Sequence, residues 1–180
     1  VIGTVLRVPG IWLLAIAYFS IKLSRYALYF RGPKSIHESL GADAQASTII
    51  AAALPIGGTV GVIATGYLSD YCFQSRRAPV AILSLIATAG ILFLGLAPIG
   101  DQWLMTALFF AIGLFLFGPD TLISGTAAVD LGTKKGAGTA AGFVNGVGSL
   151  GGILGGYLPG VLTSEEDWSR MFYVFVVGIL

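Results

Sequence analysis

The chain has 180 residues, of which 56% are hydrophobic and only 11% are charged, and its formal net charge at pH 7 is +1. Soluble domains carry roughly 25% charged residues, so this composition and a mean hydropathy of +0.87 predict an integral membrane protein. The small net charge and the lack of a basic tract argue against nucleic acid as a partner. Cys72 is the single cysteine, which excludes an internal disulfide.

Five apolar windows are long enough to cross a lipid bilayer, which takes about 20 residues, and a sixth begins near the end of the sequence. The windows show no period-two alternation, which favours helices over barrel strands. We therefore predict an all-α, polytopic membrane helix bundle. Since the sequence starts without methionine and stops within an apolar run, we expect a piece of a longer chain with its last span truncated. The predicted spans are 8–30, 46–67, 80–98, 103–128, 137–162 and 168–180.

The charges of the links predict the orientation of these spans. Arg76 and Arg77 follow the second span, and Lys134 and Lys135 follow the fourth, whereas the link at 163–169 is acidic. An excess of Lys and Arg marks the cytoplasmic side of a membrane protein. We expect both basic links to face the cytoplasm, with the protein in the cell (inner) membrane.

The first window contains two cations, Lys22 and Arg25, at bilayer depth. A cation near the bilayer centre costs roughly 2.5–3.5 kcal/mol on insertion scales, so each needs an offsetting group. Tyr18, Lys22, Arg25 and Tyr29 share one helix face, which predicts a polar cavity that binds an anion, and the planar fork of arginine suits phosphate. The alternative is that both cations reach the interface or pair with internal carboxylates. Tyr26 is expected to serve packing.

Asp120, in the stretch LFGPDTLISG, is the only acid inside a predicted span. Gly118 and Pro119 come directly before it and permit a kink or a break in the fourth span. An unpaired carboxylate at this depth is costly, so we expect Lys22 to pair with Asp120 and to leave Arg25 for the substrate. The alternative is that Asp120 takes up and releases a proton and couples proton movement to transport.

The second span ends in GYLSDYCFQSRRAP, at 66–79. Gly66 and Asp70 are one helical turn apart, and Gly66 is expected to permit close approach of a neighbouring helix. Asp70 is expected to meet Arg76, Arg77 or a neighbouring helix end. The simpler interpretation is positive-inside anchoring with one incidental acid.

The fifth span contains GVGSLG, which matches G-x-G-x-x-G but lies inside an apolar helix, so we reject a dinucleotide site. Asn145 is predicted to line the cavity, with an interhelical hydrogen bond as the alternative. Glycines at four-residue spacing instead predict a close-packing helix face, formed by Gly148, Gly152, Gly156 and Gly160.

Three stretches resemble a known family. The stretch at 66–79 resembles the cytoplasmic-loop signature of the major facilitator superfamily, a G-x-x-x-D followed by paired basic residues. The stretch FGPDTLISGTAAVDLGTKKGAGTAAGFVNGVGSLGG, at 117–152, is similar to the tenth-to-eleventh span region of the organophosphate:phosphate antiporters, the glycerol-3-phosphate and hexose-phosphate exchangers. LSRYALYF, at 23–30, resembles their seventh span, where an arginine serves the substrate phosphate, and this resemblance gives that role to Arg25.

The resemblance implies the six-span C-terminal half of a twelve-span transporter, whose N-terminal half supplies a second phosphate-binding arginine. It implies exchange of an organic phosphate, such as a sugar phosphate or glycerol-3-phosphate, for inorganic phosphate by alternating access. A membrane sensor for a sugar phosphate with the same fold is the alternative. An enzyme is not expected, because the sequence has no catalytic set, metal cluster or cofactor motif, and its one histidine, His37, lies in a polar link.

Overall fold

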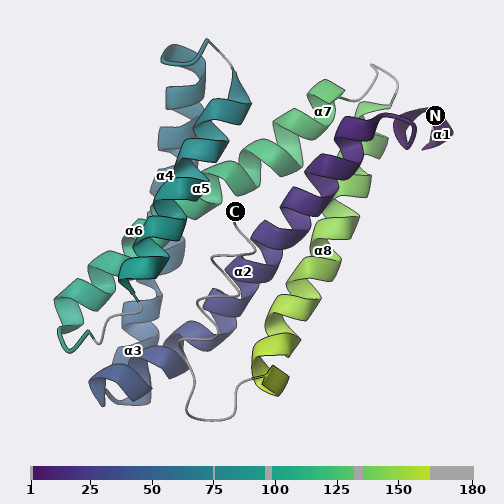
Figure 1. Cartoon of the computed structure of the whole chain (residues 1–180). Coiled ribbons are helices and arrows are strands. Elements are labelled where there is room, and N and C mark those ends of the chain that lie inside the picture. Colours follow the sequence, from purple (N-terminus) through teal and green to yellow (C-terminus); the bar gives the residue numbers. More distant parts are fainter. Residues whose placement is uncertain (1, 75, 96–98, 132–135, 163–180) are drawn as a thin grey trace.

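The computed structural model describes residues 2–74, 76–95, 99–131 and 136–162, and every element in these ranges is a helix (Figure 1). This confirms the predicted all-α fold class. The helices are α1 (Ile2–Val5), α2 (Pro9–Leu40), α3 (Ala44–Ala51), α4 (Ala53–Tyr71), α5 (Arg77–Leu94), α6 (Gln102–Thr121), the π-helix η1 (Leu122–Ala127), α7 (Ala128–Leu131) and α8 (Ala137–Leu162).

Four helical segments are long and apolar enough to cross a membrane: Pro9–Leu40, Ala44–Tyr71, Arg77–Leu94 and Gln102–Asp130. They overlap the first four predicted windows, and α8 overlaps the fifth. The sixth window, at 168–180, lies outside the described residues. Large apolar side chains on α3 and α4 point outward, since Ile49, Ile56 and Ile63 are 67%, 59% and 71% exposed. Such a stripe suits contact with lipid chains, as expected for an integral multi-pass membrane protein.

Helix α2 continues ten residues beyond the predicted end of the first span, because its polar C-terminal part stays helical. Pro33 lies inside the helix and lacks the N–H that a helix interior uses. Beyond it, Lys34 and Glu38 form an i,i+4 ion pair at 3.6 Å, which favours helix. The helix ends at Gly41, whose φ of 60° is a left-handed conformation that glycine adopts at little cost.

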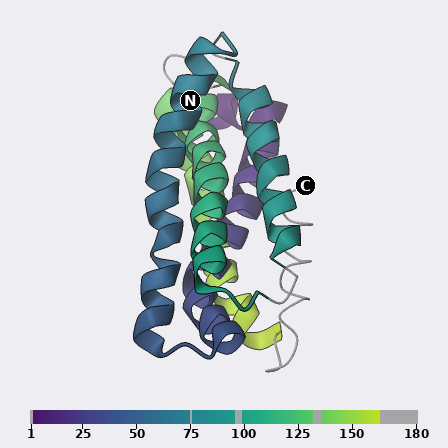
Figure 2. The ribbon, with the colours of Figure 1, turned by 90° about the vertical axis from the view of Figure 1, so that its left-hand side faces the viewer.

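The helices pack in two close parallel pairs, α2 along α8 and α4 along α6, and α5 lies against α6 (Figures 1 and 2). Glycines bring the backbones of α4 and α6 together. A Cβ built at Gly57 would lie 2.1 Å from the carbonyl oxygen of Phe110, and one at Gly61 would lie 2.0 Å from that of Leu114. Only glycine permits so close an approach at these two positions.

The contact between α2 and α8 corrects part of the predicted glycine face. The closest approaches are at Gly151 and Gly155, where a Cβ would lie 2.2 Å from the backbone oxygens of Phe19 and Leu23. Of the predicted face, Gly148 is tightly packed, because a Cβ built there would lie 2.2 Å from the Tyr18 ring. A Cβ built at Gly152 or Gly156 would meet only aromatic ring atoms, at 3.3 and 3.4 Å. The surroundings of Gly160 are not described.

No helix of the described residues makes the close approach predicted at Gly66. Apart from its chain neighbours and the backbone of its own helix, no described atom lies within 4 Å of a Cβ built at this position. The tight glycine contacts of α4 are one and two turns earlier, on the side that faces α6.

Candidate functional site

The centre of the bundle holds an ion pair between α2 and α6. Nη1 of Arg25 donates to Oδ2 of Asp120 at 2.6 Å, and the two side chains are only 25% and 8% exposed. The prediction that Lys22 pairs with Asp120 and leaves Arg25 unpaired is therefore wrong. The ammonium of Lys22 instead lies between the rings of Tyr18 and Tyr26, at 5.2 and 5.3 Å from their centroids.

Phe117 holds the same guanidinium from one side. Its ring centroid lies 3.8 Å from Cζ of Arg25, a cation–π contact worth roughly 0.5–2 kcal/mol. Phe117 is one turn before Asp120 on α6, so a single helix face supplies both groups. Gly58 of α4 makes room for the ring, because a Cβ there would lie 2.1 Å from Cδ2 of Phe117.

A cavity of about 300 Å³ opens beside Arg25, at the lower end of the range typical of small-molecule pockets. The Arg25 guanidinium is its charged group, and aromatic rings make up most of the remaining wall. Such a lining, with one cationic fork among aromatic side chains, fits a small anion that carries an organic group. The lining residues are Arg25, Tyr26, Tyr29, Phe30, Pro55 and Phe117.

Lys22 borders a second cavity, of about 420 Å³, on the side of α8. Its Nζ lies 5.2 Å from the ring centroid of Tyr18 and 5.3 Å from that of Tyr26, and it also attracts the Asp120 carboxylate electrostatically. Tyr26 and Phe30, whose ring centroids are 6.0 Å apart, line both cavities. These two rings therefore divide the Arg25 cavity from the Lys22 cavity.

The predicted stripe on α2 thus separates into two groups. Tyr18 is buried and supports Lys22, whereas Tyr29 is half exposed and lines the Arg25 cavity. Sequence reasoning assigned Tyr26 to packing and gave no contact to Phe117. Helical spacing indicates that both side chains lie beside the charged residues, because Tyr26 is four residues after Lys22 and Phe117 is three residues before Asp120.

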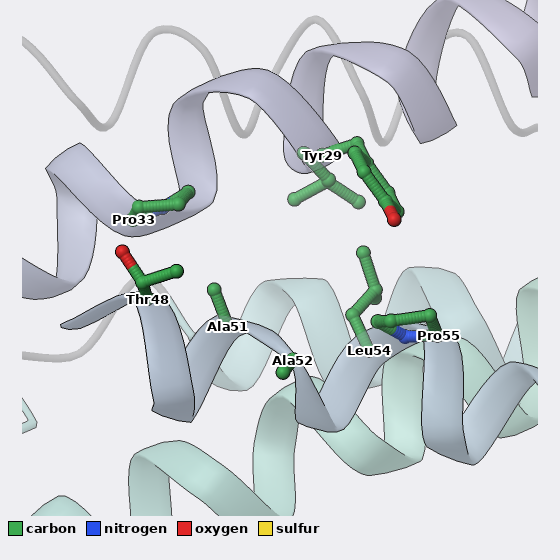
Figure 3. A pocket seen from close by; sticks show the side chains of 8 residues that line it. Tyr29, Pro33, Thr48, Ala51, Ala52, Leu54 and Pro55 are labelled. Atoms are coloured by element: carbon green, nitrogen blue, oxygen red, sulfur yellow. The ribbon is translucent and has the colours of Figure 1, made fainter. Parts of the chain in front are cut away.

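A third pocket, of about 180 Å³, lies between α2 and the junction of α3 with α4 (Figure 3). Its wall is mostly apolar, and Pro33 and Pro55 lie on its two sides. Tyr29 projects from α2 toward Leu54 and Pro55 in this view. Since Tyr29 and Pro55 line both this pocket and the Arg25 cavity, they form the boundary between the two.

Asn145 contacts backbone rather than either charged cavity. Its Nδ2 donates to the carbonyl oxygen of Ser124 in η1 at 3.2 Å, and to that of Ala141 within α8 at 3.0 Å. The π-helix follows Pro119, where the regular helical bonding is interrupted. The fourth span continues through Gly118 and Pro119 as a helix and changes to a π-helix at Leu122. Asn145 makes the interhelical hydrogen bond that was the alternative.

The signature at 66–79 lies at the opposite end of α4 from α3. Arg77 forms an ion pair with Asp130 of α7 at 3.3 Å, and this pair joins the start of α5 to the end of the fourth span. Asp70 and Arg76 are exposed. The predicted cytoplasmic cations Lys134 and Lys135 lie outside the described residues. Within those residues, no group of three or more His, Cys, Asp or Glu side chains is placed to hold a metal ion.

These features define a class of protein: a multi-pass membrane helix bundle with a buried cationic site between its helices. Residues 14–180 match the sequence profile described as Major Facilitator Superfamily. The chain belongs to this superfamily.

The chain is similar to proteins named as a membrane sensor, a sugar phosphate exchanger and a hexose phosphate transport protein. The chain is 34% identical over 178 residues to "Membrane sensor protein UhpC" of Escherichia coli (strain K12), which covers 97% of this chain and 40% of that protein. It is 30% identical to "Sugar phosphate exchanger 3" of Gallus gallus, over 94% of this chain and 35% of the relative. It is 34% identical to "Probable hexose phosphate transport protein" of Chlamydia pneumoniae, over 93% and 37%. The chain thus spans well under half the length of these relatives.

Proposed function

We propose that this chain is the C-terminal half of a membrane transporter that exchanges an organic phosphate for inorganic phosphate by alternating access. The observation that carries the proposal is Arg25, a half-buried guanidinium that is fixed by Asp120 and Phe117 and borders a cavity of about 300 Å³. Arginine's planar fork matches two phosphate oxygens at once. The names of two relatives, an exchanger and a hexose phosphate transport protein, support a sugar phosphate as the cargo.

In this proposal the halves rock around a site near the middle of the membrane. The N-terminal half supplies a further cation that faces Arg25 across the cavity. Tyr26, Tyr29 and Phe30 contact the organic part of the ligand, since aromatic faces suit the apolar faces of sugars. Lys22 raises the positive charge around the bound phosphate.

The test is counterflow uptake of labelled inorganic phosphate into proteoliposomes that hold the full-length protein, with and without Arg25→Lys. The variant keeps the charge but loses the fork, and one charge-assisted hydrogen bond is worth about 1.5–3 kcal/mol. We expect phosphate uptake that is stimulated by internal glucose 6-phosphate, and a loss of roughly 10- to 100-fold in the variant. Normal uptake by Arg25→Lys would show that Arg25 is structural.

A sensor is the second candidate, and the relative named as a membrane sensor protein favours it. The same ligand site serves a sensor, which binds a sugar phosphate and signals to a partner protein without moving it. Flux separates the two functions. Retained binding of glucose 6-phosphate by the wild type, with no uptake or counterflow, would assign this protein to the sensors.

A further inference from the structure

The cation that the proposed function gives to phosphate is already bound to a carboxylate of the protein. Nη1 of Arg25 donates to Oδ2 of Asp120 at 2.6 Å, and the remaining guanidinium borders the cavity. Carboxylate and phosphate oxygens accept the same short, charge-assisted hydrogen bonds from arginine. A phosphate in this cavity and Asp120 therefore compete for one guanidinium.

Asp120 needs another partner if phosphate displaces it. The residue is buried, and its second oxygen, Oδ1, has no hydrogen-bond partner in the part of the chain that the structure describes. A buried carboxylate that loses its cation is left as an uncompensated charge, which is strongly destabilising. Displacement of Asp120 is feasible only where a second cation lies within reach.

Lys22 is that cation. It precedes Arg25 by three residues on α2 and attracts Asp120 electrostatically. Its ammonium rests over the rings of Tyr18 and Tyr26, and the ion pairs of the described residues do not include it. A lysine is a mobile point charge on a flexible stem, so Lys22 can leave the two rings for a carboxylate without breaking another ion pair.

We propose that Asp120 is a built-in competitor of the substrate phosphate, and that Lys22 receives Asp120 when phosphate takes Arg25. This inference rests on the proposed function, in which Arg25 binds phosphate. The exchange makes two ion pairs out of one: phosphate with Arg25, and Asp120 with Lys22. A neutral sugar offers no replacement anion to Arg25, so the Arg25–Asp120 pair also discriminates against substrates that lack the phosphate group.

The competition has a measurable size. If Asp120 holds Arg25 for about nine-tenths of the time, the apparent Kd for phosphate is about tenfold higher than that of the free guanidinium. Asp120→Asn removes the competitor, and Lys22→Gln removes the second partner. The alternative role for Lys22 is direct contact with phosphate, and that contact would be lost in Lys22→Gln whatever stands at position 120.

The experiment is a double-mutant cycle on the purified full-length protein, with labelled inorganic phosphate as the probe. We expect Asp120→Asn to lower the Kd about tenfold and Lys22→Gln to raise it about tenfold. The double variant Lys22→Gln/Asp120→Asn has the same net charge as the wild type and should bind at least as tightly as the wild type. Lys34→Gln is the matched control, because Lys34 is on the same helix and pairs with Glu38 away from the site. It should leave the Kd unchanged.

Two results would overturn the inference alone: a double variant that binds as weakly as Lys22→Gln, or an unchanged Kd in Asp120→Asn. If Asp120→Asn by itself does not give monodisperse protein, the inference is still tested by comparing the phosphate Kd of Lys22→Gln with that of the charge-balanced double variant. The proposed function fails in a different way. In that case the wild type binds no phosphate, or Arg25→Lys binds it as well as the wild type does.

Discussion

The Arg25 guanidinium is held against a ring face, and this contact can be tested at one residue. Phe117 lies 3.8 Å from it, and a cation–π contact of roughly 0.5–2 kcal/mol corresponds to about 2- to 30-fold in affinity. We expect Phe117→Leu to raise the Kd for inorganic phosphate within that range and Phe117→Tyr to leave it nearly unchanged. Equilibrium binding to the full-length protein measures both. Equal affinities for all three proteins would mean that the ring only fills space.

Asn145 should matter for stability and not for ligand affinity. Its side chain satisfies the carbonyl of Ser124 in the π-helix, and an intramolecular hydrogen bond of this kind contributes about 0.5–1.5 kcal/mol. We expect Asn145→Ala to lower the thermal midpoint of the detergent-solubilised protein and to change the phosphate Kd by less than about twofold.

Ser149→Ala is the control for Asn145→Ala. Ser149 lines the Lys22 cavity, but among the described residues its hydroxyl donates within its own helix, to the carbonyl of Asn145. It should leave the thermal midpoint close to that of the wild type. A large affinity loss in Asn145→Ala with an unchanged midpoint would return Asn145 to the set of ligand contacts.

The charged residues of the site could be found from the sequence, but their pairing could not. Lys22, Arg25 and Asp120 stand out because ionised groups at bilayer depth are costly. Which cation meets Asp120 depends on the register of α2 against α6. Periodicity within one helix does not contain that register. The same missing information hid the contact of Phe117 with Arg25.

At the scale of helices, two adjacent glycines on α8 differ in how much room their surroundings leave for a side chain. Gly155 faces the backbone oxygen of Leu23 at 2.2 Å from a built Cβ, whereas Gly156 meets the Phe30 ring at 3.4 Å. Added volume in a packed contact that cannot yield costs typically about 1–3 kcal/mol. We therefore expect Gly155→Ala to lower the thermal midpoint and the yield of monodisperse protein, while Gly156→Ala behaves like the wild type.

A reversed order, with Gly156→Ala the more damaging variant, would contradict the packing of α2 on α8. It would favour instead the face that sequence spacing predicted, which includes Gly148, Gly152 and Gly156. Four-residue spacing identified a glycine-rich helix, but the backbone contact follows Gly151 and Gly155. The choice between two neighbouring glycine rows depends on how α8 is rotated toward α2, and composition does not determine that rotation.

The ends of the helices, like the pairing of the site residues, could be predicted only in part from the sequence. Hydropathy located the apolar centres of the spans, because about 20 apolar residues are needed to cross a bilayer. It placed the end of the first span near Phe30, whereas α2 runs through Pro33 to Leu40. Polar residues at a span end are as compatible with a helix that leaves the membrane as with a loop. Hydropathy alone therefore does not separate the two.

At the scale of the whole molecule, the orientation in the membrane is a prediction that one cysteine can test. Cys72 is exposed at the end of α4, beside the basic pair Arg76 and Arg77, while Ser39 is exposed near the start of α3 at the other end of the bundle (Figure 1). Positive charge marks the cytoplasmic side. In full-length protein with its other cysteines replaced, an impermeant maleimide should label Cys72 only in inside-out vesicles.

Ser39→Cys in a Cys72→Ser background supplies the opposite control and should react only in right-side-out vesicles. The two positions are joined by a single span, Ala44–Tyr71, so they must lie on opposite sides whichever way the bundle is inserted. Labelling of both from one side would contradict that span. If each cysteine instead reacted in the other kind of vesicle, the fold would stand but its orientation in the membrane would be reversed. Arg77 and Asp130, the ion pair between α5 and α7, would then lie on the outer surface. The charge rule would then have failed for this chain.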